Sequence, residues 1–325
     1  SAPQKDKRVE DKIRSSLDYN TNIFVCNGDI LALLSHEKSN LFKKKYNIHY
    51  GAWELRKYPE EWMYSINLVD EYWAMSSFLQ KSVSDVANIP VIHMPYPVDF
   101  EIPTYISRKD FGLPEEKFLF IFTFDLSSLA SRKNPYAVIK AFLSAFPSNN
   151  DVGLVIKASS NKKNPDHKKQ INDIMDLTKN DSRVHLINEI LPRDKILGLI
   201  NSCDVYVSLH RAEGFGIGMA EAMKMGKVVI ATDYSGNTDF TLSDNSCPVD
   251  YKLIDLKPLE YIYEQGKQWA DPDIEHASFY MKKLYEDRWY YNKLAKNGKN
   301  FIDTHYNAQE IMKAYDARLK ILGLI

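Results

Sequence analysis

The sequence predicts an α/β protein built from two parallel-sheet units. Short runs of apolar, β-branched and aromatic residues recur along the chain, and helical patterns lie between them. A proline-rich stretch, residues 94–103, divides this alternation into a shorter first part and a longer second part. Alternation of strands and helices favours parallel sheets with helices on both faces.

Composition and charge narrow the class of protein. The 325 residues are enough for roughly two domains. With 44% hydrophobic and 26% charged residues, the chain is neither disordered nor fibrous. A net charge of −1 gives no global field for nucleic acid, so we expect no nucleic-acid partner. No apolar stretch approaches the roughly 18 residues of a membrane span, although peripheral membrane contact is compatible with this composition.

The first part of the chain predicts four strands and one helix. The predicted strands are 22–26, 46–50, 70–74 and 90–93, and the predicted helix is 77–86. Three prolines in residues 94–103 exclude a continuous helix and indicate an extended linker.

The second part carries the stronger pattern. The predicted strands are 118–124, 152–157, 184–187, 204–208 and 227–232. The predicted helices are 135–146, 166–179, 193–201 and 217–225, followed by a mostly helical tail from residue 274. Pro135 and Pro192 suit the first turn of a helix, and Gly226 suits a helix end. Ligands of open parallel sheets bind outside the carboxyl ends of the strands, so the loops there are candidate sites.

A glycine-punctuated loop after the strand 204–208 is the strongest local signal. Gly214, Gly216 and Gly218 allow a ligand to approach the backbone, and the helix that starts near residue 217 offers unpaired N–H groups. Such a turn suits a phosphate or pyrophosphate. Glu213 in the loop and Glu221 in the first helical turn can accept hydrogen bonds from sugar hydroxyls. The plainer alternative is a tight turn followed by a helix with a favourable N-terminal charge.

Glu213 and Glu221 form a Glu-x7-Glu motif, and in this the chain resembles the family 4 retaining glycosyltransferases, which have the GT-B fold. Residues 118–251 resemble the donor-binding domain of that family, including the segments 131–135, 213–216 and 231–237. Segments 50–55, 59–62 and 269–273 resemble one bacterial branch. The resemblance implies two Rossmann-like domains facing a cleft.

The resemblance also implies roles for single residues. Glu213 would contact donor-sugar hydroxyls, Glu221 the ribose, and Lys133 the diphosphate leaving group, with help from Arg132. The expected donor site is completed by the phosphate-binding loop Gly214, Phe215 and Gly216, the base-binding loop Ile187, Asn188 and Glu189, and the pocket loop Ser235, Gly236 and Asn237.

One departure from the family concerns a cation. Many relatives carry an arginine five or six residues before the lysine, where this chain has Ser127 and Ser128. We expect Arg211 to replace it, because loops after neighbouring strands converge on one cleft; a surface arginine packed on the loop is the equally weighted alternative. His210 is expected to form a hydrogen bond with a phosphate or sugar oxygen.

Trp53 and Glu54 follow a predicted strand and are expected on the acceptor side of the cleft. Trp53 could stack on a sugar ring, although a core position is the safer expectation for a single tryptophan. Asp271 and Asp273, around Pro272, indicate a turn and a helix cap.

These observations lead to one expected function and two alternatives. We expect a retaining, metal-independent transfer of a hexose-like sugar from a nucleoside-diphosphate sugar to a hydroxyl acceptor, in the cytoplasm. The alternatives are a nucleotide-sugar-binding module without transferase activity and an epimerase-type relative, which the paired glutamates disfavour. No cofactor or metal is expected.

The domain boundaries follow from the linker. We expect an acceptor-side unit and linker at 1–106, a donor-binding domain at 107–290, and C-terminal helices at 291–325 that cross back to the first unit. Enzymes of this type usually begin with a strand and a glycine-rich loop, whereas this chain begins with the polar stretch 1–18. We therefore expect an incomplete first domain.

Overall fold

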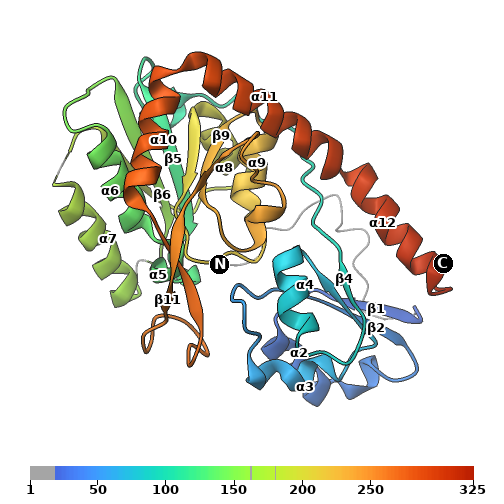
Figure 1. The fold of residues 1–325 in the computed structure, drawn as a ribbon. Helices are drawn as coiled ribbons and strands as arrows, with labels where there is room; N and C mark the ends of the chain where they lie inside the picture. Colours follow the sequence, from blue (N-terminus) through green and yellow to red (C-terminus); the bar gives the residue numbers. More distant parts are fainter. Residues whose placement is uncertain (1–18, 162, 180) are drawn as a thin grey trace.

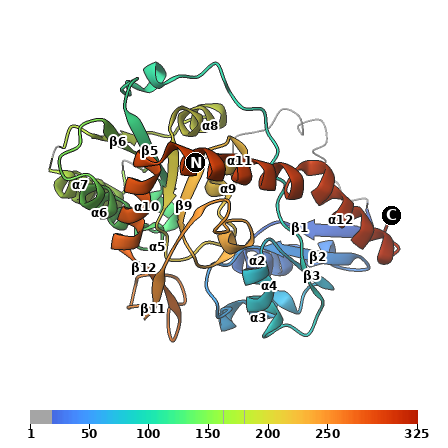
Figure 2. The ribbon, with the colours of Figure 1, turned by 45° about the horizontal axis from the view of Figure 1, so that its top comes forward.

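The computed structural model describes residues 19–161, 163–179 and 181–325. The polar stretch 1–18 lies outside the described residues. Two parallel sheets form two units, as the alternation predicts, and a pair of long C-terminal helices runs from one unit to the other (Figure 1). Residues 94–107 contain no helix or strand and run as extended chain between the units (Figure 2).

The first unit is a four-stranded parallel sheet in the order β1-β2-β3-β4. The strands are β1 (Thr21–Phe24), β2 (Tyr46–Gly51), β3 (Glu71–Ala74) and β4 (Val91–His93). The helices are α2 (Gly28–Glu37), α3 (Met63–Ile66) and α4 (Ser77–Ser84), with 3-10 turns η1 (Ser39–Leu41) and η2 (Glu60–Trp62). All four predicted strands and the helix α4 are confirmed within two residues, whereas α2 was not predicted.

The second unit is a six-stranded parallel sheet in the order β10-β9-β8-β5-β6-β7. The strands are β5 (Phe118–Asp125), β6 (Val152–Ser159), β7 (Val184–Asn188), β8 (Val205–Ser208), β9 (Val228–Thr232) and β10 (Cys247–Val249). The helices are α5 (Ala130–Lys133), α6 (Pro135–Ala145), α7 (Pro165–Thr178), α8 (Arg193–Ser202) and α9 (Ile217–Lys224), with 3-10 turns η3 (Arg108–Phe111), η4 (Leu126–Ser128) and η5 (Gly236–Asp239). This is the Rossmann order, and it reverses between β5 and β8, which is where such sheets bind ligands.

Both faces of the second sheet are covered, which explains its near-continuous apolar strands. Along β5, Leu119 and Ile121 belong to the core that includes α8 and α9, whereas Phe120 and Phe122 belong to the core under α6 and α10. All four side chains are at most 1% exposed. The first of these two cores continues without interruption into the first unit.

An antiparallel ribbon of β11 (Tyr251–Asp255) and β12 (Gln268–Pro272) follows the second sheet and was not predicted. The expectation of a turn at Asp271 is wrong, because Asp271 pairs with Lys252 inside this ribbon. The expected helix cap at Asp273 is confirmed, since its carboxylate accepts a hydrogen bond from His276 N at 3.0 Å.

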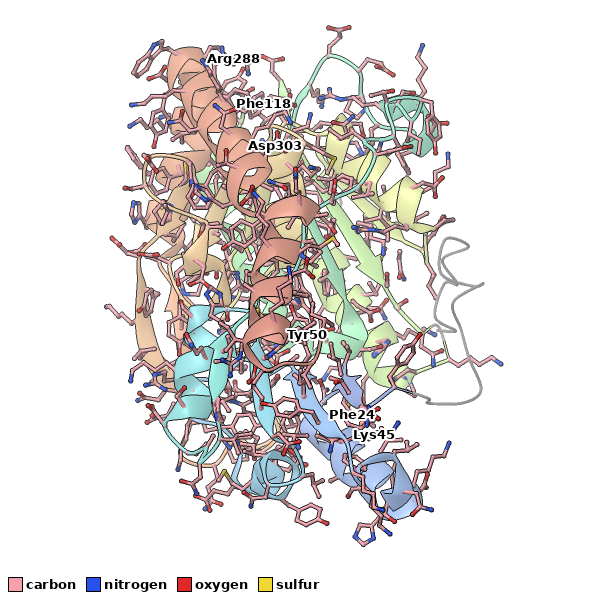
Figure 3. All side chains as sticks on the ribbon, turned by 90° about the vertical axis from the view of Figure 1, so that its right-hand side faces the viewer. Phe24, Lys45, Tyr50, Phe118, Arg288 and Asp303 are labelled. Carbon is pink, nitrogen blue, oxygen red and sulfur yellow. The ribbon has the colours of Figure 1, made fainter. Side chains whose placement is uncertain are left out.

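The C-terminal helices are α10 (Ile274–Glu286), α11 (Arg288–His305) and α12 (Ala308–Ile321). Helix α10 packs on α6, and α11 packs on α9. Figure 3 follows α11 and α12 from Arg288 past Asp303 to the level of Tyr50 in the first unit. There Arg318 donates to the buried Glu71 carboxylate at 3.0 and 3.1 Å, so α12 fastens the second unit to the first.

Candidate functional site

A cavity of about 300 Å³ opens at the carboxyl ends of β5, β6 and β8, beside the point where the strand order reverses. Helices α8 and α9 form its other wall. Its charged lining residues are Asp125, Lys133, Lys157, Arg193, Glu213 and Glu221. The structure therefore brings the two glutamates of the motif and Lys133 together, although 80 residues separate Lys133 from Glu213 in the chain.

The glycine-rich loop is held in place by close backbone contacts. Gly216 has a φ of 96°, in the left-handed region that favours glycine, and it caps the start of α9. A Cβ on Gly236 would lie 2.1 Å from the carbonyl oxygen of Gly214, so only glycine fits there. Gly236 N donates to Glu213 O at 2.9 Å, and Glu213 N donates to the Ser235 hydroxyl at 2.8 Å. The Ser235–Asn237 loop thus fixes the backbone of Glu213 through these two hydrogen bonds.

Two cations hold the carboxylate of Glu213. Lys133 donates to Oε1, and Nη1 of Arg132 lies 3.4 Å from Oε2. Both cations come from the one-turn helix α5, which lies between Leu129 and Asn134, two residues with positive φ. Burial alone would raise the pKa of Glu213, but Lys133 and Arg132 hold that pKa at about 2. Glu213 is therefore ionised at neutral pH and accepts hydrogen bonds.

Arg132 joins the site to the first unit. Its guanidinium is buried, donates to Ala212 O at 2.8 Å and lies 3.7 Å from the Glu54 carboxylate. Tyr261 donates to the other oxygen of Glu54. Glu54, from the first unit, therefore contacts the second unit through Arg132 and Tyr261. Trp53 is 0% exposed and donates its ring N–H to Lys57 O at 3.0 Å, so it occupies the core position rather than a sugar-stacking one.

Glu221 lies in the second turn of α9 rather than in its first turn, because the helix starts at Ile217. Its side chain is buried and receives a charged hydrogen bond from Arg193 at the start of α8. Burial raises the pKa of Glu221, and Arg193 opposes that rise. A ribose diol at this position would meet a desolvated carboxylate whose other oxygen is available for hydrogen bonds.

His210 is fully buried and is not among the residues that line the cavity. Its Nε2 donates to Asn237 Oδ1 at 2.9 Å, and its Nδ1 accepts from the Ser208 hydroxyl at 3.0 Å. Burial lowers the pKa of His210, which favours the neutral ring. Asn237 in turn donates to Thr232 O at 2.9 Å. His210 and Asn237 therefore position the loop and do not line the cavity.

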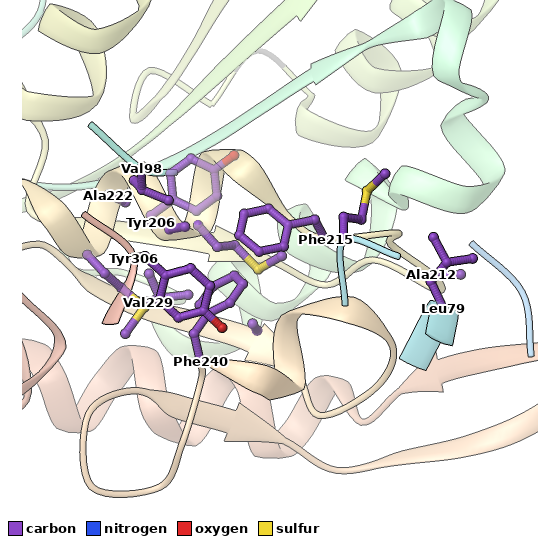
Figure 4. Close-up of a cluster of buried hydrophobic side chains, with 14 of the residues drawn as sticks. Leu79, Val98, Tyr206, Ala212, Phe215, Ala222, Val229, Phe240 and Tyr306 are labelled. Carbon is purple, nitrogen blue, oxygen red and sulfur yellow. The ribbon is translucent and has the colours of Figure 1, made fainter. Parts of the chain in front are cut away.

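Two further expected residues do not line the cavity either. Arg211 donates to Asp271 at 3.0 and 3.3 Å and to Ser131 O at 3.1 Å, and its guanidinium lies over the Trp269 ring. Arg211 thus turns toward β12, which fits the packed-arginine alternative rather than the cavity cation. The Phe215 ring lies among buried side chains (Figure 4), with its centroid 5.2 Å from that of Phe240.

The expected base-binding loop lines a second cavity of about 520 Å³ that adjoins the first through Asp125 and Ser159. Asn188 and Glu189 line it, and the Ser160 hydroxyl donates to Asn188 Oδ1 at 2.7 Å. Ile187 instead packs against the core of the sheet.

Sequence reasoning missed two cations of the cavity, Lys157 and Arg193. Pro192 at a helix start was a signal for Arg193, because the first residue of a helix that follows a strand points toward the ligand edge of the sheet.

Within residues 19–161, 163–179 and 181–325, no group of three His, Cys, Asp or Glu side chains is placed to hold a metal ion. In the same part of the chain, no helix is both long and apolar enough to cross a bilayer.

Comparison with protein families places this site in context. Residues 105–247, from the end of the linker to β10, match the sequence model of a family described as glycosyl transferases group 1. A search of curated proteins gives no significant match.

Solved structures share the fold. Sucrose-phosphate synthase from Thermosynechococcus elongatus has a TM-score of 0.71 at 14% identity, over 94% of this chain and 75% of that chain. Anabaena HepE in complex with UDP and glucose has a TM-score of 0.68 at 15% identity, over 92% and 77%. The pneumococcal O-GlcNAc transferase GtfA with UDP and GlcNAc has a TM-score of 0.64 at 13% identity, over 93% and 57%.

These likenesses confirm the predicted GT-B fold of two Rossmann-like units. The family match covers residues 105–247, which is less than half of the chain, and the fold likeness extends over most of it.

Proposed function

We propose that the chain is a retaining glycosyltransferase that moves a hexose-like sugar from a nucleoside-diphosphate sugar to a hydroxyl of a glycan, a lipid-linked sugar or a polysaccharide. The observation that carries this proposal is the cavity at the reversal of strand order, where Lys133 pairs with Glu213 and Glu221 lies on the adjoining helix. The group 1 match over residues 105–247 and the UDP in the HepE and GtfA structures also support it.

In this proposal the donor lies along the edge of the second sheet. The base enters the cavity of Asn188 and Glu189, and Glu221 accepts hydrogen bonds from the ribose. The backbone N–H groups of Gly216 and of the start of α9, which line the cavity, would face the phosphates, with Lys133 beside them. Glu213, held ionised by its low pKa of about 2, accepts hydrogen bonds from the donor sugar.

The proposed step is a front-face displacement at the anomeric carbon. The acceptor oxygen forms a bond to C1 as the bond from C1 to the phosphate oxygen breaks, and the electron pair leaves with the diphosphate. The acceptor proton passes to a phosphate oxygen, so no enzymic base is needed. Lys133 stabilises the charge that develops on the diphosphate, and Glu213 orients the sugar as it gains oxocarbenium character.

The proposal includes a metal-independent reaction in the cytoplasm. Lysine and backbone amides at the cavity supply the positive potential that a metal would otherwise supply. Cys26, Cys203 and Cys247 are free thiols, which suits a reducing compartment.

Glu213→Gln tests the proposed enzyme. We expect the wild type to transfer or hydrolyse one of UDP-glucose, UDP-GlcNAc and a GDP-hexose, and Glu213→Gln to lose at least 100-fold in turnover. Glu116→Gln, at an exposed position, is the matched control and should keep full activity. Melting temperatures of all three proteins show whether they are folded.

The outcomes separate the alternatives. Nucleotide binding without turnover by the wild type, across a panel of acceptors, would favour the binding module. A product with inverted anomeric configuration, read by NMR, would refute the front-face mechanism.

A further inference from the structure

Lys157 is a buried lysine in the middle of a sheet. It lies near the carboxyl end of β6, opposite Thr123 of β5 on one side and Ile187 of β7 on the other. It is 4% exposed and lines the cavity that contains Lys133 and Glu213. Its neighbours along the strand, Val155 and Ile156, are 0% exposed. Lysines are almost never buried in this way unless their charge has a use or a partner.

The other cations of the cavity have carboxylate partners. Lys133 is paired with Glu213, and Arg193 is paired with Glu221. The Nζ of Lys157 instead contacts the neutral Ser159 hydroxyl. Among the described residues, no carboxylate oxygen lies within the 4.0 Å of an ion pair with it, although Asp125 contributes a more distant negative charge. Burial lowers the pKa of Lys157, as expected for a cation held away from water without a paired anion.

A buried cation of this kind is costly unless an anion arrives during function. The cavity is built for an anion on other grounds, because the glycine-rich loop and the start of α9 line it together with Lys133. Arg211, a nearby cation, is bound to Asp271 and does not line the cavity.

We propose that Lys157 binds the diphosphate of the nucleotide substrate, as a second lysine of the cavity beside Lys133. This inference rests on the proposed function, because it takes the anion of this cavity to be a nucleoside diphosphate. Lys157 reaches the cavity from strand β6, whereas Lys133 reaches it from the one-turn helix α5. Lys157 is therefore a substrate-binding residue on a rigid element.

The experiment compares Lys157→Met with Lys140→Met by titration calorimetry. Methionine keeps the length of the side chain and removes the charge. Lys140 lies exposed on the outer face of α6, so its substitution is the matched control. We expect Lys157→Met to lose about 10- to 100-fold in affinity for UDP and less than twofold for uridine, because only the diphosphate meets the ammonium. Lys140→Met should bind both as the wild type does.

Stability gives a second readout. Because Lys157 lacks an ion pair in the folded protein, Lys157→Met should melt at or above the wild-type temperature. Lys157→Arg keeps the charge and should retain most of the affinity for UDP.

The two proposals fail in different ways. If wild-type protein binds none of UDP, ADP and GDP, the proposed function fails. If it binds UDP and folded Lys157→Met binds it equally well, the Lys157 inference alone is overturned. Equal losses in Lys157→Met and Lys157→Arg would assign Lys157 to packing and also overturn it.

Discussion

Replacing Arg132 by methionine removes one of the two cations beside Glu213 and leaves the side-chain volume nearly unchanged. The guanidinium lies 3.4 Å from the Glu213 carboxylate and 3.7 Å from that of Glu54, in a buried position. Without it, the carboxylates of Glu54 and Glu213 lose the cation that they share, and only Lys133 remains paired with Glu213. We therefore expect Arg132→Met to destabilise the protein and to impair turnover together.

The magnitude follows from the pKa of Glu213. Its ordinary value is 4.5, and Arg132 and Lys133 hold it at about 2 in the folded protein. That difference corresponds to roughly 3 kcal/mol of unfolding free energy at pH 7, from both cations together. Because the folded pKa is depressed, this stability is present above pH 4.5 and is lost as the pH falls toward 2. We expect Arg132→Met to cost about 2 kcal/mol at pH 7.

Urea unfolding at pH 7 and pH 3 measures this effect. At pH 3 roughly half or more of the Glu213 contribution is gone, so the gap between wild type and Arg132→Met should narrow by a similar fraction. Arg288→Met, at an exposed position at the start of α11 (Figure 3), is the control and should differ from wild type by less than about 0.5 kcal/mol at both pH values. An Arg132→Met cost that is the same at both pH values would refute the electrostatic reasoning.

Three further predictions concern residues that position the site or lie next to it. Arg318→Met leaves the Glu71 carboxylate buried without its cation and should cost about 3 kcal/mol in urea unfolding; a cost below 1 kcal/mol would show that α12 does not fasten the units. Gly236→Ala should abolish turnover, because the added Cβ would clash with the loop that carries Gly214. The control Gly266→Ala lies in open space with a φ of 65°, so it should cost only about 1 kcal/mol of stability and keep turnover. Equal turnover of the two variants would contradict this prediction. Arg211→Met should change turnover less than about threefold, and a loss of orders of magnitude would restore the hypothesis that Arg211 serves the leaving group.

The strands were predictable because their residues carry the signal themselves. Apolar β-branched and aromatic runs mark strands that are buried on both faces, and every predicted strand is present. The ribbon of β11 and β12 carries no such signal, because residues 251–255 are exposed except for the partly buried Ile254. Helix α2 was missed because it begins at Gly28, buries only Gly28 and Leu31, and follows a strand predicted two residues too long.

The sequence predicted which residues belong to the candidate site, but it did not predict the directions of their side chains. The motif indicated Glu213, Glu221 and Lys133, and these do line one cavity. The direction of Arg211 could not be read from the sequence, because it is set by Asp271 on β12, a strand that was not predicted. Lys157 was passed over because a lysine at the end of an apolar run resembles the exposed end of a strand.

A structure of the protein with UDP bound tests the central claim most directly. The account predicts the diphosphate in the cavity at the ends of β5, β6 and β8, with phosphate oxygens within hydrogen-bond distance of Lys133 and of backbone N–H groups in residues 214–218, and the ribose at Glu221. A nucleotide found elsewhere, for example in the hollow lined by Arg56 and Lys267, would contradict it.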